Sequence, residues 1–155
     1  MFEMPVRRVI KRGDLLRAPP GISVAEAARR MARKNVGAMA VMDLERLVGI
    51  FTERDIVFRV VAQGLDPRAT CVADVMTRSV QAIHVDEPFG RALLIMHDNG
   101  FRHLPVLDDG KLVGMVSGRS ALDPELEDFV FEARRREYLR REHRPPRLIP
   151  SKKKR

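Results

Sequence analysis

Two stretches of the chain repeat the same order of hydrophobic and polar positions. Within residues 22–35, apolar side chains recur at the spacing of one helical face, as Val24, Ala27 and Met31 illustrate. Residues 88–100 repeat this spacing. Each helical stretch is followed by two short apolar runs that are joined by a polar turn, which is the pattern of a β-hairpin. Each copy therefore predicts a helix followed by two antiparallel strands.

Capping and turn residues mark the ends of these elements. Ser23 is placed to cap the first helix, and Gly100 suits the end of the second. Asp109-Gly110 between two apolar runs is a strong signal for a tight hairpin. A further helix is expected after each hairpin, beginning near Glu53 and near Gly118. With a short strand ahead of each first helix, each copy reads strand–helix–strand–strand–helix.

A gap-free offset superimposes the two copies. Shifting the chain by 65 residues gives eight identities over the 29 positions from 27 to 55, including a Leu-Val-Gly tripeptide at 47–49 and 112–114. Such an internal repeat predicts two copies of one supersecondary unit. Because one copy of about 60 residues buries little surface, the two copies are expected to share a core.

These patterns define the predicted fold class and domain layout. The fold class is α/β (α+β), with two pseudo-symmetric βαββα units packed as one module. The predicted segments are a first unit at 6–63, a linker and short helix at 64–76, a second unit at 77–126, a C-terminal helix at 123–143 and a disordered basic tail at 144–155.

The positive charge of the chain is confined to one end. The formal net charge is +8, yet residues 1–131 contain eighteen basic and eighteen acidic residues, whereas residues 132–155 contain eleven basic and three acidic ones. Any contact with nucleic acid or an acidic surface is therefore predicted for the tail alone. With one Tyr and no Trp in this tail, base stacking is scarce, so such binding would be unspecific.

Composition also narrows the class of protein. No run of apolar residues is long enough for a membrane span, and the N-terminus lacks the apolar core of a signal peptide. The single cysteine, Cys71, is expected to be an inert packing residue in a reduced cytoplasm. The four histidines show no paired metal-ligand spacing, so no metal site is predicted. No nucleotide-binding loop or catalytic motif is found, and an enzyme is not expected.

A hydroxyl and a carboxylate follow the first hairpin, at Thr52 and Asp55. Free amides at the start of a helix, together with a hydroxyl, suit a phosphate, and an acid one turn on can accept bonds from ribose hydroxyls. Arg54 and Arg59 would add positive charge. The same spacing also fits a capping box, in which Thr52 caps the helix and the acid reaches back. Both interpretations can hold in one structure.

As a set, these motifs resemble a pair of cystathionine-β-synthase (CBS) domains. The two repeats, the "RHLPVLD" stretch of the second copy and the phrase "TERDIVFRVVAQGLDP" are similar to stand-alone bacterial and archaeal CBS-pair proteins. The resemblance covers residues 6–126. It implies a regulatory module that binds AMP, ADP, ATP, S-adenosylmethionine or NAD in the cleft between the units. No cofactor is required, and a homodimer that regulates a protein partner is expected.

The resemblance also implies which residues form two sites. The first site takes Thr52, Arg54 and Asp55, facing Ile83, Val85, Phe101, Arg102 and His103. The second site takes Ser117, Arg119 and Ser120, facing Ile22, Val36 and Gly37. Ser120 replaces the carboxylate of the first copy, which costs roughly 1.5–3 kcal/mol when a charge-assisted bond is lost. We therefore expect one good site and one weak or empty site.

Two alternatives stay open at this level. The chain could be a nucleic-acid-binding protein that uses its basic tail, with the CBS pair as a dimerisation scaffold. It could also be a purely structural dimer in which Thr52 and Asp55 only cap a helix.

Overall fold

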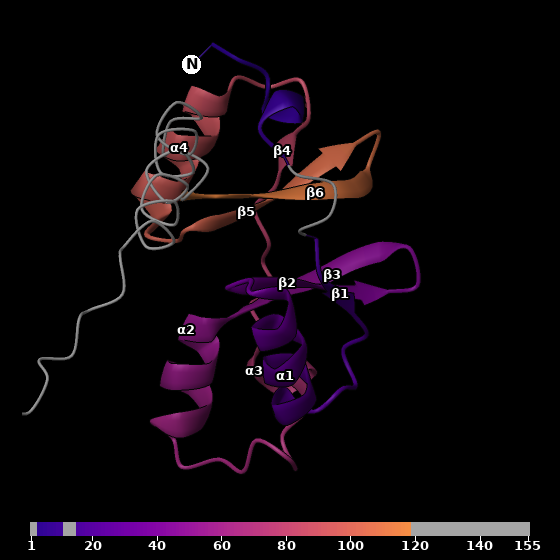
Figure 1. The fold of residues 1–155 in the computed structure, drawn as a ribbon, viewed down its shortest axis with the longest axis vertical. Coiled ribbons are helices and arrows are strands. Elements are labelled where there is room, and N and C mark those ends of the chain that lie inside the picture. Colours follow the sequence, from indigo (N-terminus) through magenta and orange to yellow (C-terminus); the bar gives the residue numbers. More distant parts are fainter. Residues whose placement is uncertain (1–2, 11–14, 119–155) are drawn as a thin grey trace, which may run out of the picture. The chain divides into compact units, whose positions relative to one another are not determined.

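The computed structural model describes residues 3–10 and 15–118 of the chain (Figure 1). The predicted C-terminal helix and basic tail lie outside the described residues, as do Arg119, Ser120 and the second helix of the second copy. Among the described helices, none is long and apolar enough to cross a membrane.

The first copy forms a three-stranded sheet with helices on one face (Figure 1). Strand β2 pairs antiparallel with β3 and parallel with β1. In chain order the elements are β1 (Arg17–Ala18), α1 (Val24–Lys34), β2 (Ala38–Asp43), β3 (Arg46–Thr52), α2 (Glu53–Asp55) and a π-helical turn η2 (Ile56–Val61). The predicted order of elements is confirmed for this copy.

The second copy repeats this sheet. Its elements are β4 (Ile83–His84), α4 (Phe89–Asn99), β5 (His103–Asp108) and β6 (Lys111–Ser117), and β5 lies between the other two strands. Even the irregularity is shared, because the register of both hairpins shifts after the central valine, Val41 in one copy and Val106 in the other. The internal repeat is thus confirmed over the described strands.

The predicted capping and turn residues have the expected conformations. The Ser23 hydroxyl accepts a hydrogen bond from the backbone N–H of Glu26 at 3.2 Å, which caps α1. Gly100 ends α4 with a left-handed φ of 68°. In the β5–β6 turn, Asp109 and Gly110 both have positive φ, at 45° and 77°. Two consecutive left-handed residues match the twist of a hairpin, which explains the Asp-Gly pair.

Each copy of the repeat buries its own core, and each core is completed by a distant segment. The turn η1 (Val6–Arg8) precedes the first copy, yet Val6 is fully buried in the core of the second. The short helix α3 (Val72–Val75) precedes the second copy, and Val72, Val75 and Met76 pack into the core of the first. The leading segments are therefore exchanged between the two copies.

The exchange explains the glycine of each Leu-Val-Gly tripeptide. A Cβ atom added to Gly49 would overlap the Sδ atom of Met76, and one added to Gly114 would lie 3.0 Å from Cδ1 of Ile10. Each glycine thus gives room on its sheet to the side chain of an incoming segment. The repeated glycine is therefore a packing requirement at both positions.

Candidate functional site

Thr52 and Asp55 form a complete capping box at the end of β3. The Asp55 carboxylate oxygen Oδ2 accepts hydrogen bonds from the Thr52 backbone N–H at 2.8 Å and from its hydroxyl at 2.9 Å. The Thr52 hydroxyl accepts a bond from the Asp55 backbone N–H at 3.4 Å. The capping prediction is confirmed. Asp55 is only 7% exposed, so its carboxylate is fixed in place.

The first turn of this helix offers fewer free amides than the sequence predicted. The backbone N–H of Glu53 donates to the Gly37 carbonyl at 3.1 Å, and that of Asp55 is taken by Thr52. The second copy repeats the first of these bonds, because Gly118 N–H donates to the Arg102 carbonyl at 2.8 Å. The expectation of free amides is therefore wrong for Glu53 and Asp55. An anion bound here would depend chiefly on cationic side chains.

Arg59 does not have the role that the sequence suggested. Its guanidinium donates to the Val75 carbonyl at 2.8 Å, and its Nε atom lies 3.4 Å from the Asp55 carboxylate. Arg59 thus connects Asp55 of the capping box to Val75 of α3, the short helix in the segment between the two copies. It does not line the cavity described next.

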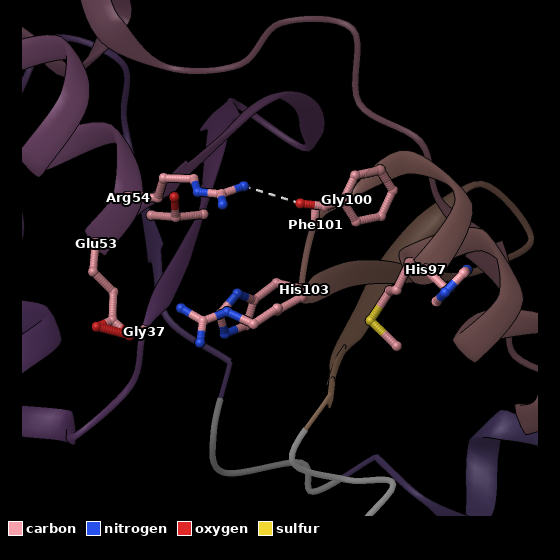
Figure 2. Close-up of a pocket in the computed structure, with 10 residues that line it drawn as sticks. Gly37, Glu53, Arg54, His97, Gly100, Phe101 and His103 are labelled. Atoms are coloured by element: carbon pink, nitrogen blue, oxygen red, sulfur yellow. Dashed lines mark hydrogen bonds between the residues drawn. The ribbon is translucent and has the colours of Figure 1, made fainter.

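A cavity lies where the end of β3 meets the α4–β5 connection (Figure 2). Its volume is about 360 Å³, within the range of roughly 300–1,000 Å³ that is usual for small-molecule sites. Both copies of the repeat contribute to its wall. The lining residues are Gly37, Thr52, Glu53, Arg54, Met96, His97, Gly100, Phe101, Arg102 and His103.

Five residues of the predicted first site meet in this cavity, namely Thr52, Arg54, Phe101, Arg102 and His103. Figure 2 shows the Arg54 side chain reaching across to Gly100, where Nη1 donates to the backbone carbonyl at 3.0 Å. The guanidinium also lies 5.8 Å from the centre of the Phe58 ring, in a cation–π arrangement. Arg54 therefore links the two copies of the repeat at the cavity.

The remaining predicted residues lie elsewhere. Ile83 and Val85 are each 4% exposed in the core of the second copy and do not line the cavity. Gly37, which was assigned to the second site, lines this one instead. The other described residues of the second site are half-buried: Ile22 and Val36 pack against the core of the first copy, and Ser117 pairs with His103 in the β5–β6 register.

Three lining side chains were not predicted: Glu53, Met96 and His97. Glu53 stands between Thr52 and Arg54 in the motif, and its carboxylate lies where a Cβ on Gly37 would be. His97 precedes Gly100 by three residues, so it shares the last turn of α4 with the residue that ends the helix. His97 and Phe101 line the same cavity because the chain reverses at Gly100, between α4 and β5. The spacing of residues along the chain does not predict this contact.

Charged groups around the cavity are mostly basic. Arg54 and Arg102 are exposed and carry full positive charges, and His97 and His103 add two imidazoles, against the single carboxylate of Glu53. Such a wall attracts anions, and arginine is well suited to phosphate because its guanidinium can donate two parallel bonds. Phe101, which is half-buried, supplies an apolar surface beside these cations.

Comparison with known proteins identifies the class. The sequence model of the CBS domain matches residues 6–62 and 72–123, which contain the two copies of the repeat. The chain therefore belongs to the CBS-domain family. More narrowly, it contains a tandem CBS pair, as the two matches and the solved structures of such pairs show.

The curated relatives are proteins without an enzymatic name. An uncharacterized protein of Methanopyrus kandleri, MK0525, is 33% identical over 75% of this chain. An uncharacterized 17.7 kDa protein of Acidianus ambivalens is 43% identical over 64% of this chain. The chain spans only 60% of the length of each of these relatives.

Solved structures share the fold over most of the chain. A putative signal-transduction protein with CBS domains from Burkholderia ambifaria has 31% identity and a TM-score of 0.75, covering 81% of this chain and 96% of that one. The CBS domain pair of protein MJ0100 has 28% identity and a TM-score of 0.69, covering 76% and 96%. That pair was solved in complex with methylthioadenosine and S-adenosylmethionine, so a protein of similar structure binds adenosine ligands.

Proposed function

We propose that this CBS pair is a regulatory sensor that binds an adenosine nucleotide in the cavity beside Thr52 and Arg54. The observation that carries the proposal is the meeting of five predicted site residues, from both copies of the repeat, in one cavity. The adenosine ligands of the MJ0100 pair support the ligand class. Because the wall includes both copies, a bound ligand would favour one arrangement of the two, which is how a sensor shifts an equilibrium.

Charge favours a phosphorylated ligand within that class. Two arginines, Arg54 and Arg102, stand against one carboxylate, so AMP, ADP or ATP suits the cavity better than S-adenosylmethionine, whose sulfonium is a cation. NAD has both a pyrophosphate and a cationic nicotinamide ring, so we expect its affinity to lie between that of the nucleotides and that of S-adenosylmethionine. Asp55 does not line the cavity, and its carboxylate is held by the capping box with Thr52.

The test is thermal unfolding of the full chain with millimolar AMP, ADP, ATP, S-adenosylmethionine or NAD. A ligand at one hundred times its dissociation constant stabilises the fold by about 2.7 kcal/mol. For a domain of this size the melting temperature then rises by several degrees. Asp55 is a poor test residue because its replacement also removes the helix cap.

Exposed arginines give a cleaner pair of variants. Arg102→Gln should remove most of the shift produced by a phosphorylated ligand, whereas Arg68→Gln, at an exposed arginine in the loop before α3, should leave it intact. The proposal fails if no adenosine ligand stabilises the wild type. A shift that is equal in both variants would also contradict the assigned cavity.

An exposed apolar surface supports the expected homodimer. Val57, Phe58, Val61 and Leu65 are 52%, 59%, 67% and 43% exposed, and they lie together on and just after η2. A surface of this kind on a small module favours burial against another chain. We infer that a second copy of the module covers it, because the resemblance to CBS pairs implies a homodimer and this apolar surface is exposed in the single chain.

Sedimentation of the full chain tests this inference. Val61→Glu places a charge in the surface and should yield a monomer. Leu44→Glu, at a residue that is 93% exposed in the β2–β3 turn, is the matched control and should remain a dimer. A wild type that sediments as a monomer at all concentrations would overturn the inference.

The alternative function depends on residues 132–155, which lie outside the described residues. Binding of nucleic acid through this basic segment stays a prediction. It requires a steep dependence on salt that disappears when the chain is truncated at Arg144. Binding that is insensitive to salt would exclude it.

A further inference from the structure

Three potential metal ligands gather at one end of the second sheet. One ligand atom from each of His84, Asp108 and Asp109 lies within 4.8 Å of the others, and all three residues are exposed. Strand pairing brings them together: β4 runs parallel to β5 with His84 beside Leu107, and Asp108 and Asp109 follow directly. The left-handed φ of Asp109 turns the chain back at this point.

We propose that this cluster binds a divalent transition-metal ion of the Zn²⁺ type. An imidazole with carboxylates favours such ions, whereas Mg²⁺ and Ca²⁺ prefer oxygen ligands alone. Zinc takes nitrogen and oxygen ligands at about 2.0–2.2 Å, and ligand atoms within 4.8 Å of one another can reach one ion by small side-chain rotations. Exposed side chains can rotate in this way, and water would complete the coordination.

The surroundings of the cluster orient the imidazole and set the charge. The Asp86 backbone N–H donates to His84 Nδ1 at 3.3 Å, and the Asp86 carboxylate, which is paired with Arg7, lies 3.8 Å from the same nitrogen. This hydrogen bond holds the imidazole in one orientation at the end of the sheet. Lys111 lies opposite Asp108 in the β5–β6 register, so one positive charge stands on the strand beside the cluster.

The first copy of the repeat provides an internal comparison. At the offset of 65 residues, Pro19 replaces His84, Leu44 replaces Asp109, and only Asp43 matches Asp108. A single acid at the end of the central strand is therefore common to both hairpins and needs no metal to explain it. The second acid of the first hairpin is Glu45, which aligns with Gly110 and not with Asp109, and the imidazole is present only in the second copy.

The first experiment is a calorimetric titration of the full chain with Zn²⁺, repeated with Mg²⁺. We expect a Zn²⁺ site that His84→Ala weakens by roughly tenfold or more, because one of three ligands is lost. Asp109→Asn should weaken the same site, and Mg²⁺ should bind far more weakly than Zn²⁺. All three side chains are exposed, so these variants should fold, which circular dichroism can verify.

Matched controls separate this site from incidental binding. His97→Ala removes an exposed imidazole that also contacts a carboxylate, at 3.3 Å from Asp98, and Asp43→Asn removes the equivalent acid of the first copy. Neither should change Zn²⁺ affinity. In a proton–nitrogen spectrum, Zn²⁺ should shift the His84 ring signals and leave those of His97 in place.

The proposal is overturned by either of two results. One is the absence of Zn²⁺ binding to the wild type at millimolar concentration. The other is equal binding by the wild type, His84→Ala and Asp109→Asn, which would place the metal elsewhere on the chain. Neither result depends on the nucleotide cavity, because the cluster shares no residue with it.

Discussion

The two copies of the repeat have the same strands and the same register shift, but they differ in the side chains at the ends of their hairpins. After β3 the first copy has the Thr52–Asp55 capping box, whereas the equivalent positions of the second are Ser117 and Ser120. In the turn of the hairpin, the second copy has the acid Asp109 where the first copy has Leu44. The repeated backbone thus fixes where side chains stand, and single substitutions decide which chemistry each position supports.

The cores differ as well, at equivalent positions of the two central hairpins. Phe51 and Val116 align at the offset of 65 residues, and both are fully buried. Phe51→Ala should destabilise the protein by about 3–5 kcal/mol, whereas Val116→Ala removes fewer buried atoms and should cost about 1.5–3 kcal/mol. Urea unfolding measures both, and a larger loss for Val116→Ala would show that the second core tolerates cavities less well.

The predicted second site has Ser120 where the first copy has an acid. Ser120→Asp should strengthen ligand binding at this predicted site by roughly 10- to 100-fold, because a charge-assisted bond of about 1.5–3 kcal/mol would be gained. Titration calorimetry reports this as an increase in the number of bound nucleotides. Ser120→Asn, which offers no charge, is the control. If both variants bind only one nucleotide, Ser120 does not explain the difference between the sites.

The capping box predicts a smaller effect on the first copy alone. Thr52→Ala removes the hydroxyl that accepts from Asp55 N–H, and loss of a cap costs about 0.5–2 kcal/mol. Thr52→Ser keeps the hydroxyl and should retain most of the stability. Chemical denaturation compares the two variants, and equal losses would mean that the methyl group, not the cap, stabilises this turn.

The smallest expected effect concerns the first turns of α1 and α4, where Glu26 aligns with Arg91. Hydrogen bonds from Arg30 and Arg29 lower the pKa of Glu26. Its stabilising contribution is therefore complete above the ordinary pKa of glutamate and is lost as the pH falls through the lowered value. Glu26→Gln should melt slightly below the wild type at neutral pH, and the difference should vanish in acid. If the difference in melting temperature persisted in acid, its cause would be something other than the charge of Glu26.

Local signals were enough to predict much of the fold. The offset of 65 residues located both hairpins, and Ser23, Gly100 and Asp109-Gly110 have the predicted roles because caps and tight turns depend on neighbouring residues. The exchange of Val6 and Met76 between the cores was not predicted. It depends on contacts between residues far apart in sequence, which hydrophobic periodicity does not encode.

In the candidate sites, too, residues of one local motif could be predicted, whereas contacts between distant segments could not. Thr52, Arg54 and the residues around Phe101 were found because they belong to a contiguous motif. The burial of Ile83 and Val85 and the approach of His84 to Asp108 follow from strand pairing, which spacing along the chain does not reveal. Glu53 was missed although it lies within the motif, because only residues with an expected ligand contact were chosen.

The exchanged leading segments make the module indivisible. A cut in the loop that contains Gly64 would give a first fragment that keeps Val6, whose apolar pocket belongs to the other half, and lacks Met76, which fills its own. Neither fragment alone should be self-sufficient, while the two mixed together can complement each other.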